Sequence, residues 1–193
     1  LLKIDSANTE WTAAAATTYL TLGETKLAAG DPGGAKRSLM TANSQIRSLS
    51  AQDNSVAKWR MIQIRARLLQ SAIDANEHEH LQAFAASRDA EARIRALPSA
   101  GRDDSDARWL RNRARWQQGM ALREMGNLPA ARVAFLAITT DVPDLDEEPR
   151  MMALRANAFS QLGDAAAEAK LARQMHDFGW EYANFRESRL ILR

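Results

Sequence analysis

Apolar residues in this chain fall into eight stretches of helical length, separated by short polar breaks that are rich in glycine, proline, asparagine and aspartate. Alanine, leucine and arginine dominate the stretches, and these residues favour the α-helix. No stretch shows the alternating β-branched residues that are typical of a strand. We therefore predict an all-α fold, with helices at about 9–29, 35–49, 56–75, 79–97, 106–125, 130–140, 147–162 and 165–176.

The breaks predict how the helices are paired. Segments 30–34 (GDPGG) and 126–129 (GNLP) each place a glycine just past one helix and a proline near the start of the next. Segment 98–101 (PSAG) ends one pair, and Gly163-Asp164 separates the last two helices. Because the connections are only a few residues long, consecutive helices are expected to lie against each other.

Three tryptophans show that the pairs repeat. Trp11, Trp59 and Trp109 stand 48 and 50 residues apart, and five residues before each lies a small residue of a type that caps helices: Ser6, Asn54 and Asp104. A repeated helix pair of this size predicts a helical superhelix. We expect one domain over 1–193, with units at about 6–50, 54–97, 104–141 and 146–177 and a C-terminal cap at 178–193.

The units resemble the tetratricopeptide repeat, in which small and large residues occupy fixed positions of a helix-turn-helix. The third unit carries the pattern in Gly119, Leu122, Gly126, Ala131, Phe135 and Pro143, and the first in Tyr19, Leu22, Gly23, Gly30, Ala35, Leu39 and Ala42. The second departs from it, with His78 in place of the turn glycine. The length of the units is closer to the long, Trp-containing repeats of bacterial multidomain signalling proteins, which sit beside ATPase, kinase or DNA-binding domains.

Composition narrows the class of protein. Hydrophobic residues make up 46% of the 193 residues and aromatic residues 6%, as expected for a helical protein with small interfaces. The absence of cysteine excludes disulfides, thiolate zinc sites and cysteine nucleophiles. A net charge of +2 is too small to favour nucleic acid as a partner. The longest uncharged stretch, 11–23, is too short to span a membrane, so no membrane insertion is expected.

The first residues, Leu1-Leu2-Lys3-Ile4-Asp5, contain neither an initiating methionine nor a signal-peptide pattern. They are similar to the helix end that precedes Trp59, so we expect Leu1 to follow an earlier repeat or domain of a longer protein. A processed end with no repeat before it is the alternative. The expected compartment is the cytoplasm, or the periplasm if an N-terminal anchor has been removed.

The tryptophans have two interpretations. At the start of a first helix, Trp11, Trp59 and Trp109 are expected to pack on the preceding unit and seal each junction; the alternative is an exposed aromatic ladder for a ligand. Trp116 lies seven residues after Trp109, at a position that faces the inner groove in the family that this chain resembles. Trp116 is therefore the aromatic candidate for contact with a partner.

Basic residues concentrate on two first helices: residues 54–73 and 107–123 contain no acidic residue. First helices line the concave side of such superhelices, so a positive groove is expected, formed by Arg113, Trp116, Met120 and Arg123 and extended by Arg150 and Asn157. Arginine binds carboxylates bidentately, which indicates an acidic peptide or a C-terminal carboxylate. The alternative is that the arginines are solvated or pair with acidic residues of neighbouring helices.

No catalytic or cofactor site is predicted. His78 and His80 lie two residues apart, so they do not share a helix face, and His176 is distant in sequence. The acidic segment 141–148 lacks the ligand spacing and central glycine of a calcium loop, and it is expected to be a linker that favours the start of the next helix. We therefore expect no enzyme but a protein-interaction or regulatory scaffold module, or alternatively a ligand- or peptide-sensing domain that controls an attached effector.

Overall fold

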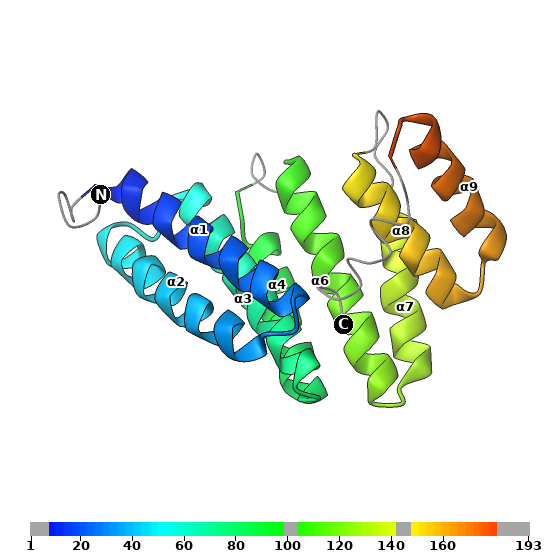
Figure 1. Ribbon diagram of the computed structural model, residues 1–193, viewed down its shortest axis with the longest axis horizontal. Coiled ribbons are helices and arrows are strands. Elements are labelled where there is room, and N and C mark those ends of the chain that lie inside the picture. The colour runs from blue at the N-terminus through cyan, green and yellow to red at the C-terminus, as the bar shows by residue number, and fades with distance from the viewer. Residues whose placement is uncertain (1–7, 99–103, 142–147, 181–193) are drawn as a thin grey trace.

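The computed structural model describes residues 8–98, 104–141 and 148–180 of the 193-residue chain. These residues form eight α-helices and no strand (Figure 1). The helices are α1 (Thr9–Ala28), α2 (Pro32–Gln52), α3 (Ala57–Asn76), α4 (His80–Arg95), α6 (Ser105–Glu124), α7 (Leu128–Thr139), α8 (Pro149–Leu162) and α9 (Ala165–Asp177). The predicted all-α class is confirmed in this part of the chain, and each predicted helix is present with ends shifted by at most three residues.

Local chemistry explains where the helices begin and end. The side chains of Asn8, Asp31, Asn127 and Asp164 each accept a hydrogen bond from a backbone N–H in the first turn of the following helix. Three of the turns inside the helix pairs contain a glycine with a positive φ of 78° to 79°. In the turn between α3 and α4 the corresponding residue is His78, with a φ of 64°. This left-handed conformation is unfavourable for a residue with a side chain.

The helices follow one another along the long axis of the molecule as four pairs (Figure 1). Each described helix packs against the next one in the chain, both within a pair and between pairs. The first helices of the pairs, α1, α3, α6 and α8, also pack side by side in that order. One side of the molecule is therefore built from first helices, which belong to segments that are far apart in the sequence.

Four clusters of buried apolar residues hold the described pairs together. The first three clusters each combine a helix pair with the first helix of the next pair, so that packing continues from α1 to α8; the fourth joins α8 to α9. Small residues allow close approach between helices. A Cβ added to Gly119 of α6 would lie 2.5 Å from Cε1 of Phe135, which is 2% exposed in α7.

Two of the three repeating tryptophans seal junctions, as predicted. Trp59 is 8% exposed and belongs to the cluster that joins α1 and α2 to α3. Trp109 packs against the second and third clusters and so links the second helix pair to the later ones. Trp11 is half-buried at the start of α1. The alternative of an exposed aromatic ladder is therefore wrong for Trp59.

Most of the predicted C-terminal cap, residues 181–193, lies outside the described residues. Of its first residues, Phe178 is 71% exposed and Trp180 is 47% exposed. In the described part of the chain, no helix has both the length and the apolar character that a membrane crossing requires.

Candidate binding cleft

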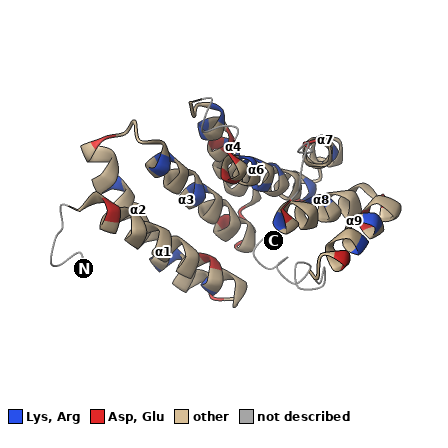
Figure 2. Cartoon of the chain, turned by 90° about the horizontal axis from the view of Figure 1, so that it is seen from above, with Lys and Arg blue, Asp and Glu red and all other residues tan. Residues whose placement is uncertain are grey.

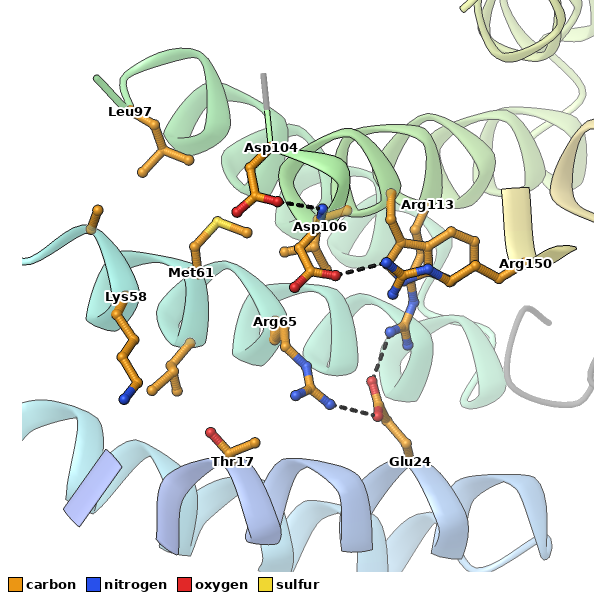
Figure 3. Close-up of a pocket in the computed structure, with 14 residues that line it drawn as sticks. Thr17, Glu24, Lys58, Met61, Arg65, Leu97, Asp104, Asp106, Arg113 and Arg150 are labelled. Atoms are coloured by element: carbon orange, nitrogen blue, oxygen red, sulfur yellow. Dashed lines mark hydrogen bonds and ion pairs between the residues drawn. The ribbon is translucent and has the colours of Figure 1, made fainter. Parts of the chain in front are cut away.

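A cleft of about 720 Å³ lies on the side of the molecule that the first helices form. Its walls come from α1, α3 and α6, from Arg150 of α8, and from Leu97 and Asp104, which flank the segment between α4 and α6 (Figure 3). Ligand pockets in proteins typically measure about 300–1,000 Å³, and this cleft falls within that range. Helices of all four pairs therefore meet at one site.

One wall of the cleft is an ion-pair cluster that joins three helices. Glu24 of α1 lies between Arg65 of α3 and Arg113 of α6, and both guanidinium groups point toward its carboxylate (Figure 3). Nη2 of Arg65 is 3.1 Å from Oε2, and Nη1 of Arg113 is 2.7 Å from Oε1. Each carboxylate oxygen thus accepts one charge-assisted hydrogen bond. The contacts link residues 41 and 89 positions apart in the sequence.

This cluster is much more buried than a surface ion pair. The side chain of Arg113 is 7% exposed and that of Glu24 is 15% exposed. Burial of the Glu24 carboxyl raises its pKa, but the charges and hydrogen bonds of Arg113 and Arg65 lower it by more, so the pKa lies below the ordinary value of 4.5. Glu24 is therefore ionised at neutral pH.

The cluster also holds an unused donor. Nη2 of Arg113 is buried and has no hydrogen-bond acceptor among the described residues. Two guanidinium groups share one carboxylate, so the cluster carries one positive charge more than it balances. A buried arginine with a free N–H group and excess positive charge is suited to an anionic group of a ligand.

A second set of charged residues also lines the cleft. Arg150 of α8 donates a hydrogen bond to Asp106 at 2.7 Å, and its guanidinium carbon lies 5.4 Å from the centre of the Trp109 ring. The Asp104 side chain accepts a hydrogen bond from the backbone N–H of Asp106 and caps α6. Lys58 pairs with Glu10 at 2.6 Å. The charged side chains of these ion pairs are more exposed than that of Arg113, from 37% for Arg150 to 68% for Glu10.

Apolar side chains form much of the rest of the lining. Met61 and Ile62 of α3 and Leu110 of α6 line the cleft, together with Ala57 and Leu97. A ligand that fills the cleft would therefore meet both an apolar surface and charged groups. This combination favours binding of an amphipathic segment, because apolar contacts provide affinity and a few charged groups fix the orientation.

Of the six residues predicted to form a partner-binding groove, Arg113 and Arg150 line the cleft. The predicted accessible position of Trp116 is wrong: Trp116 is 3% exposed and stacks at a tilt on Phe135, with 5.4 Å between ring centres. The reason is that α7 and α8 cover this part of α6, where Trp116 belongs to their shared apolar cluster.

The remaining three predicted residues also lie outside the cleft. Asn157 is buried in α8 at 2% exposure, so its predicted surface position is wrong. Met120 is half-buried and packs against the same cluster as Trp116. Arg123, near the end of α6, bonds to Glu124 and to Gln161. The six residues therefore do not form one continuous surface.

Pairing with acidic residues, the alternative interpretation of the basic helices, agrees with the structure for most of them. Figure 2 shows basic positions along α3 and α6, with acidic positions on the neighbouring helices. Arg67 pairs with Asp89 of α4, and Arg111 and Arg115 both pair with Asp141. Burial raises the pKa of Asp141, but hydrogen bonds from Asn112 and Arg111 and the charges of Arg111 and Arg115 lower it by more. The pKa therefore lies below its ordinary value of 3.8. A uniformly positive groove is therefore absent from the described residues.

The acidic segment 141–148 has two described residues. Asp141 bonds back to α6 and so does not favour the next helix as predicted, whereas Glu148 is the N-cap residue of α8. Residues 142–147 lie outside the described residues. No group of three or more histidine or acidic side chains suited to a metal ion occurs among the residues that the structure describes.

Sequence reasoning missed Glu24, the residue at the centre of the ion-pair cluster. Arg65 was one of several basic residues on its helix, and no local signal separated it from the others. A carboxylate on the first helix and arginines on later helices become related only through packing.

No family model matches the chain, and comparisons with curated proteins and with solved structures found no match either.

Proposed function

We propose that this chain is a tetratricopeptide-like superhelix that acts as a protein-interaction or regulatory scaffold module of a larger protein. Its cleft takes a peptide segment of a partner that carries a carboxylate. The observation that supports this function is the buried Arg113, which lines the cleft, pairs with Glu24 and keeps one N–H group without an acceptor among the described residues.

The chemistry of the walls defines the peptide. A carboxylate, from an acidic side chain or a C-terminus, would balance the second positive charge of Arg65 and Arg113. An apolar side chain next to it would contact Met61 and Leu110. The cleft also offers both charges through the ion pair of Arg150 and Asp106. The preferred peptide therefore combines a carboxylate with a neighbouring apolar side chain, and is not acidic throughout.

A synthetic peptide array tests this function. The peptides would carry one aspartate or glutamate at varied positions in an apolar background, each with a free and an amidated C-terminus. We expect bound peptides to share a carboxylate, and the amidated set to show whether that carboxylate is terminal. Arg65→Gln should weaken the selected peptides about tenfold or more, because hydrogen bonds to charged groups contribute about 1.5–3 kcal/mol.

Arg123 provides the matched control. It lies on α6 outside the cleft, so Arg123→Gln removes the same charge and should leave peptide affinity unchanged. Arg113→Lys keeps the buried charge but removes the planar fork, and it should weaken binding as well. Equal effects of Arg65→Gln and Arg123→Gln, or binding that ignores the carboxylate, would refute the proposed site.

A sensing domain is the second candidate function, and Glu24 favours it. This carboxylate joins α1 to α3 and α6, so a ligand carboxylate that takes its place on Arg113 would release the first helix pair from the third. Sensing then requires a change in the curvature of the superhelix. Small-angle X-ray scattering with a saturating peptide measures this directly, and an unchanged profile would count against the sensor.

A further inference from the structure

A second hollow, separate from the cleft, lies between α2, α3 and α4. It has a volume of about 280 Å³ and shares no lining residue with the cleft. Three arginines from three different helices surround it: Arg47 of α2, Arg67 of α3 and Arg93 of α4. Side-chain amides of Asn43, Gln63 and Gln70 line the rest, above a floor of buried Ile46 and Ala66.

The arginines of this hollow have too few carboxylates to balance them. Arg67 and Arg93 share one oxygen of Asp89, Oδ2, at 2.8 Å and 2.9 Å from their Nε atoms. Among the described residues, Arg47 is exposed and pairs with no acidic side chain. Asp74 of α3, which does not line the hollow, accepts a hydrogen bond from Gln70 at 2.6 Å and pairs with none of the three arginines. Positive charge therefore exceeds negative charge around the hollow.

Three guanidinium groups around one hollow match a phosphoryl group. Asp89 is the acidic partner of both Arg67 and Arg93, whose Nε atoms lie closest to it, so two guanidinium groups depend on a single carboxylate oxygen. Planar guanidinium groups bind phosphate oxygens in pairs, and a phosphate ester carries a charge of about −1.5 to −2 at neutral pH with three acceptor oxygens. A single carboxylate would leave part of the charge excess unbalanced.

We infer that this hollow is a binding site for the phosphoryl group of a small phosphorylated ligand, held by Arg47, Arg67 and Arg93. The small volume favours a compact phosphate ester over the backbone of a nucleic acid, which needs an extended basic surface. This site depends neither on the cleft nor on its peptide.

Titration with O-phosphoserine, compared with serine, tests the inference because the two probes differ only in the phosphoryl group. Binding is followed by NMR chemical shifts at constant ionic strength. We expect saturable shifts at 43–47, 63–70 and 93 with phosphoserine and none with serine. Affinity should also fall between about pH 7 and about pH 5, because the second phosphate pKa is near 6.

Arg47→Gln is the informative variant, because Arg47 is exposed and has no acidic partner among the described residues, so its replacement should leave the fold intact. We expect phosphoserine to bind at least tenfold more weakly to it. Arg132→Gln, at an exposed position of α7, removes the same charge and should have no effect. Shifts that never saturate, equal effects of both variants, or tighter binding of a single-stranded oligonucleotide through the same arginines would overturn the inference.

Discussion

Replacement of Glu24 by alanine should destabilise the protein far more than its position on the wall of a cleft indicates. The variant leaves Arg113, with a side chain only 7% exposed, without its carboxylate partner. Removal of one partner from a buried ion pair costs about 3–5 kcal/mol, because the remaining charge stays out of water. Glu24 is 15% exposed and Arg65 is 28% exposed, which places the expected loss near the lower limit, at about 3 kcal/mol.

Urea denaturation, followed by tryptophan fluorescence, measures this loss as a change in the free energy of unfolding. In a thermal melt of a protein of this size, a loss of about 3 kcal/mol corresponds to a fall in melting temperature of roughly 6–12 °C. Arg65→Ala should cost less than Glu24→Ala, because it removes the more exposed member of the cluster and leaves Glu24 paired with Arg113. This difference between the two variants separates the cost of leaving a buried charge unpaired from the simple loss of an ion pair.

Glu124 supplies the control for this experiment. It pairs with Arg123 at 2.8 Å, but the two side chains are 46% and 38% exposed. Exposed pairs contribute about 0–1 kcal/mol, so Glu124→Ala should change stability little. Arg113→Met added to Glu24→Ala removes the isolated charge and should restore most of the stability. Equal losses for Glu24→Ala and Glu124→Ala, or no recovery in the double variant, would refute the reasoning.

Three further predictions concern packing, a turn and pH. Gly119→Ala places a methyl group against the Phe135 ring and should lower stability by about 1–2 kcal/mol. Gly33→Ala should not lower stability, because a Cβ added at Gly33 would have no other atom closer than 3.7 Å. Thermal melts of the two variants test this difference. His78→Gly should raise stability by about 1 kcal/mol, because glycine adopts the positive φ of 64° without strain, and a lower melting temperature would contradict this. Because the pKa of Glu24 is lowered in the folded protein, its stabilisation is present above about pH 4.5 and is lost as pH falls through the folded pKa; the wild type should therefore lose more stability on acidification than Glu24→Gln, and parallel pH profiles would contradict the assignment.

The helices could be predicted from the sequence because their signals are local. Capping residues such as Asp31 and Asn127 contact only the next turn of the chain, and turn residues such as Gly30 act through their own φ. Even the exception was visible, since His78 stands at the one turn within the first three pairs that lacks glycine, and it adopts the same left-handed conformation.

The site was harder to predict, because the sequence shows which side of a helix a residue lies on but not which other helices cover that side. Arg113 and Trp116 are three residues apart and point to similar sides of α6, yet Arg113 lines the cleft and Trp116 is covered by α7 and α8. How far the next helix pair extends over α6 depends on packing between distant segments. The same holds for Glu24, whose partners lie 41 and 89 residues away.

The contact between Glu24 and Arg113 has a consequence for how the chain unfolds. In stacked helix pairs, most contacts join neighbours, so an end pair can detach while the others stay folded. This ion pair instead ties the first pair to the third, past the second. Loss of α1 therefore exposes an unbalanced charge in α6, which makes fraying at this end costly. The first three pairs should unfold together, and the pair α8–α9, which no such contact to α1 secures in the described residues, should exchange its amide hydrogens sooner.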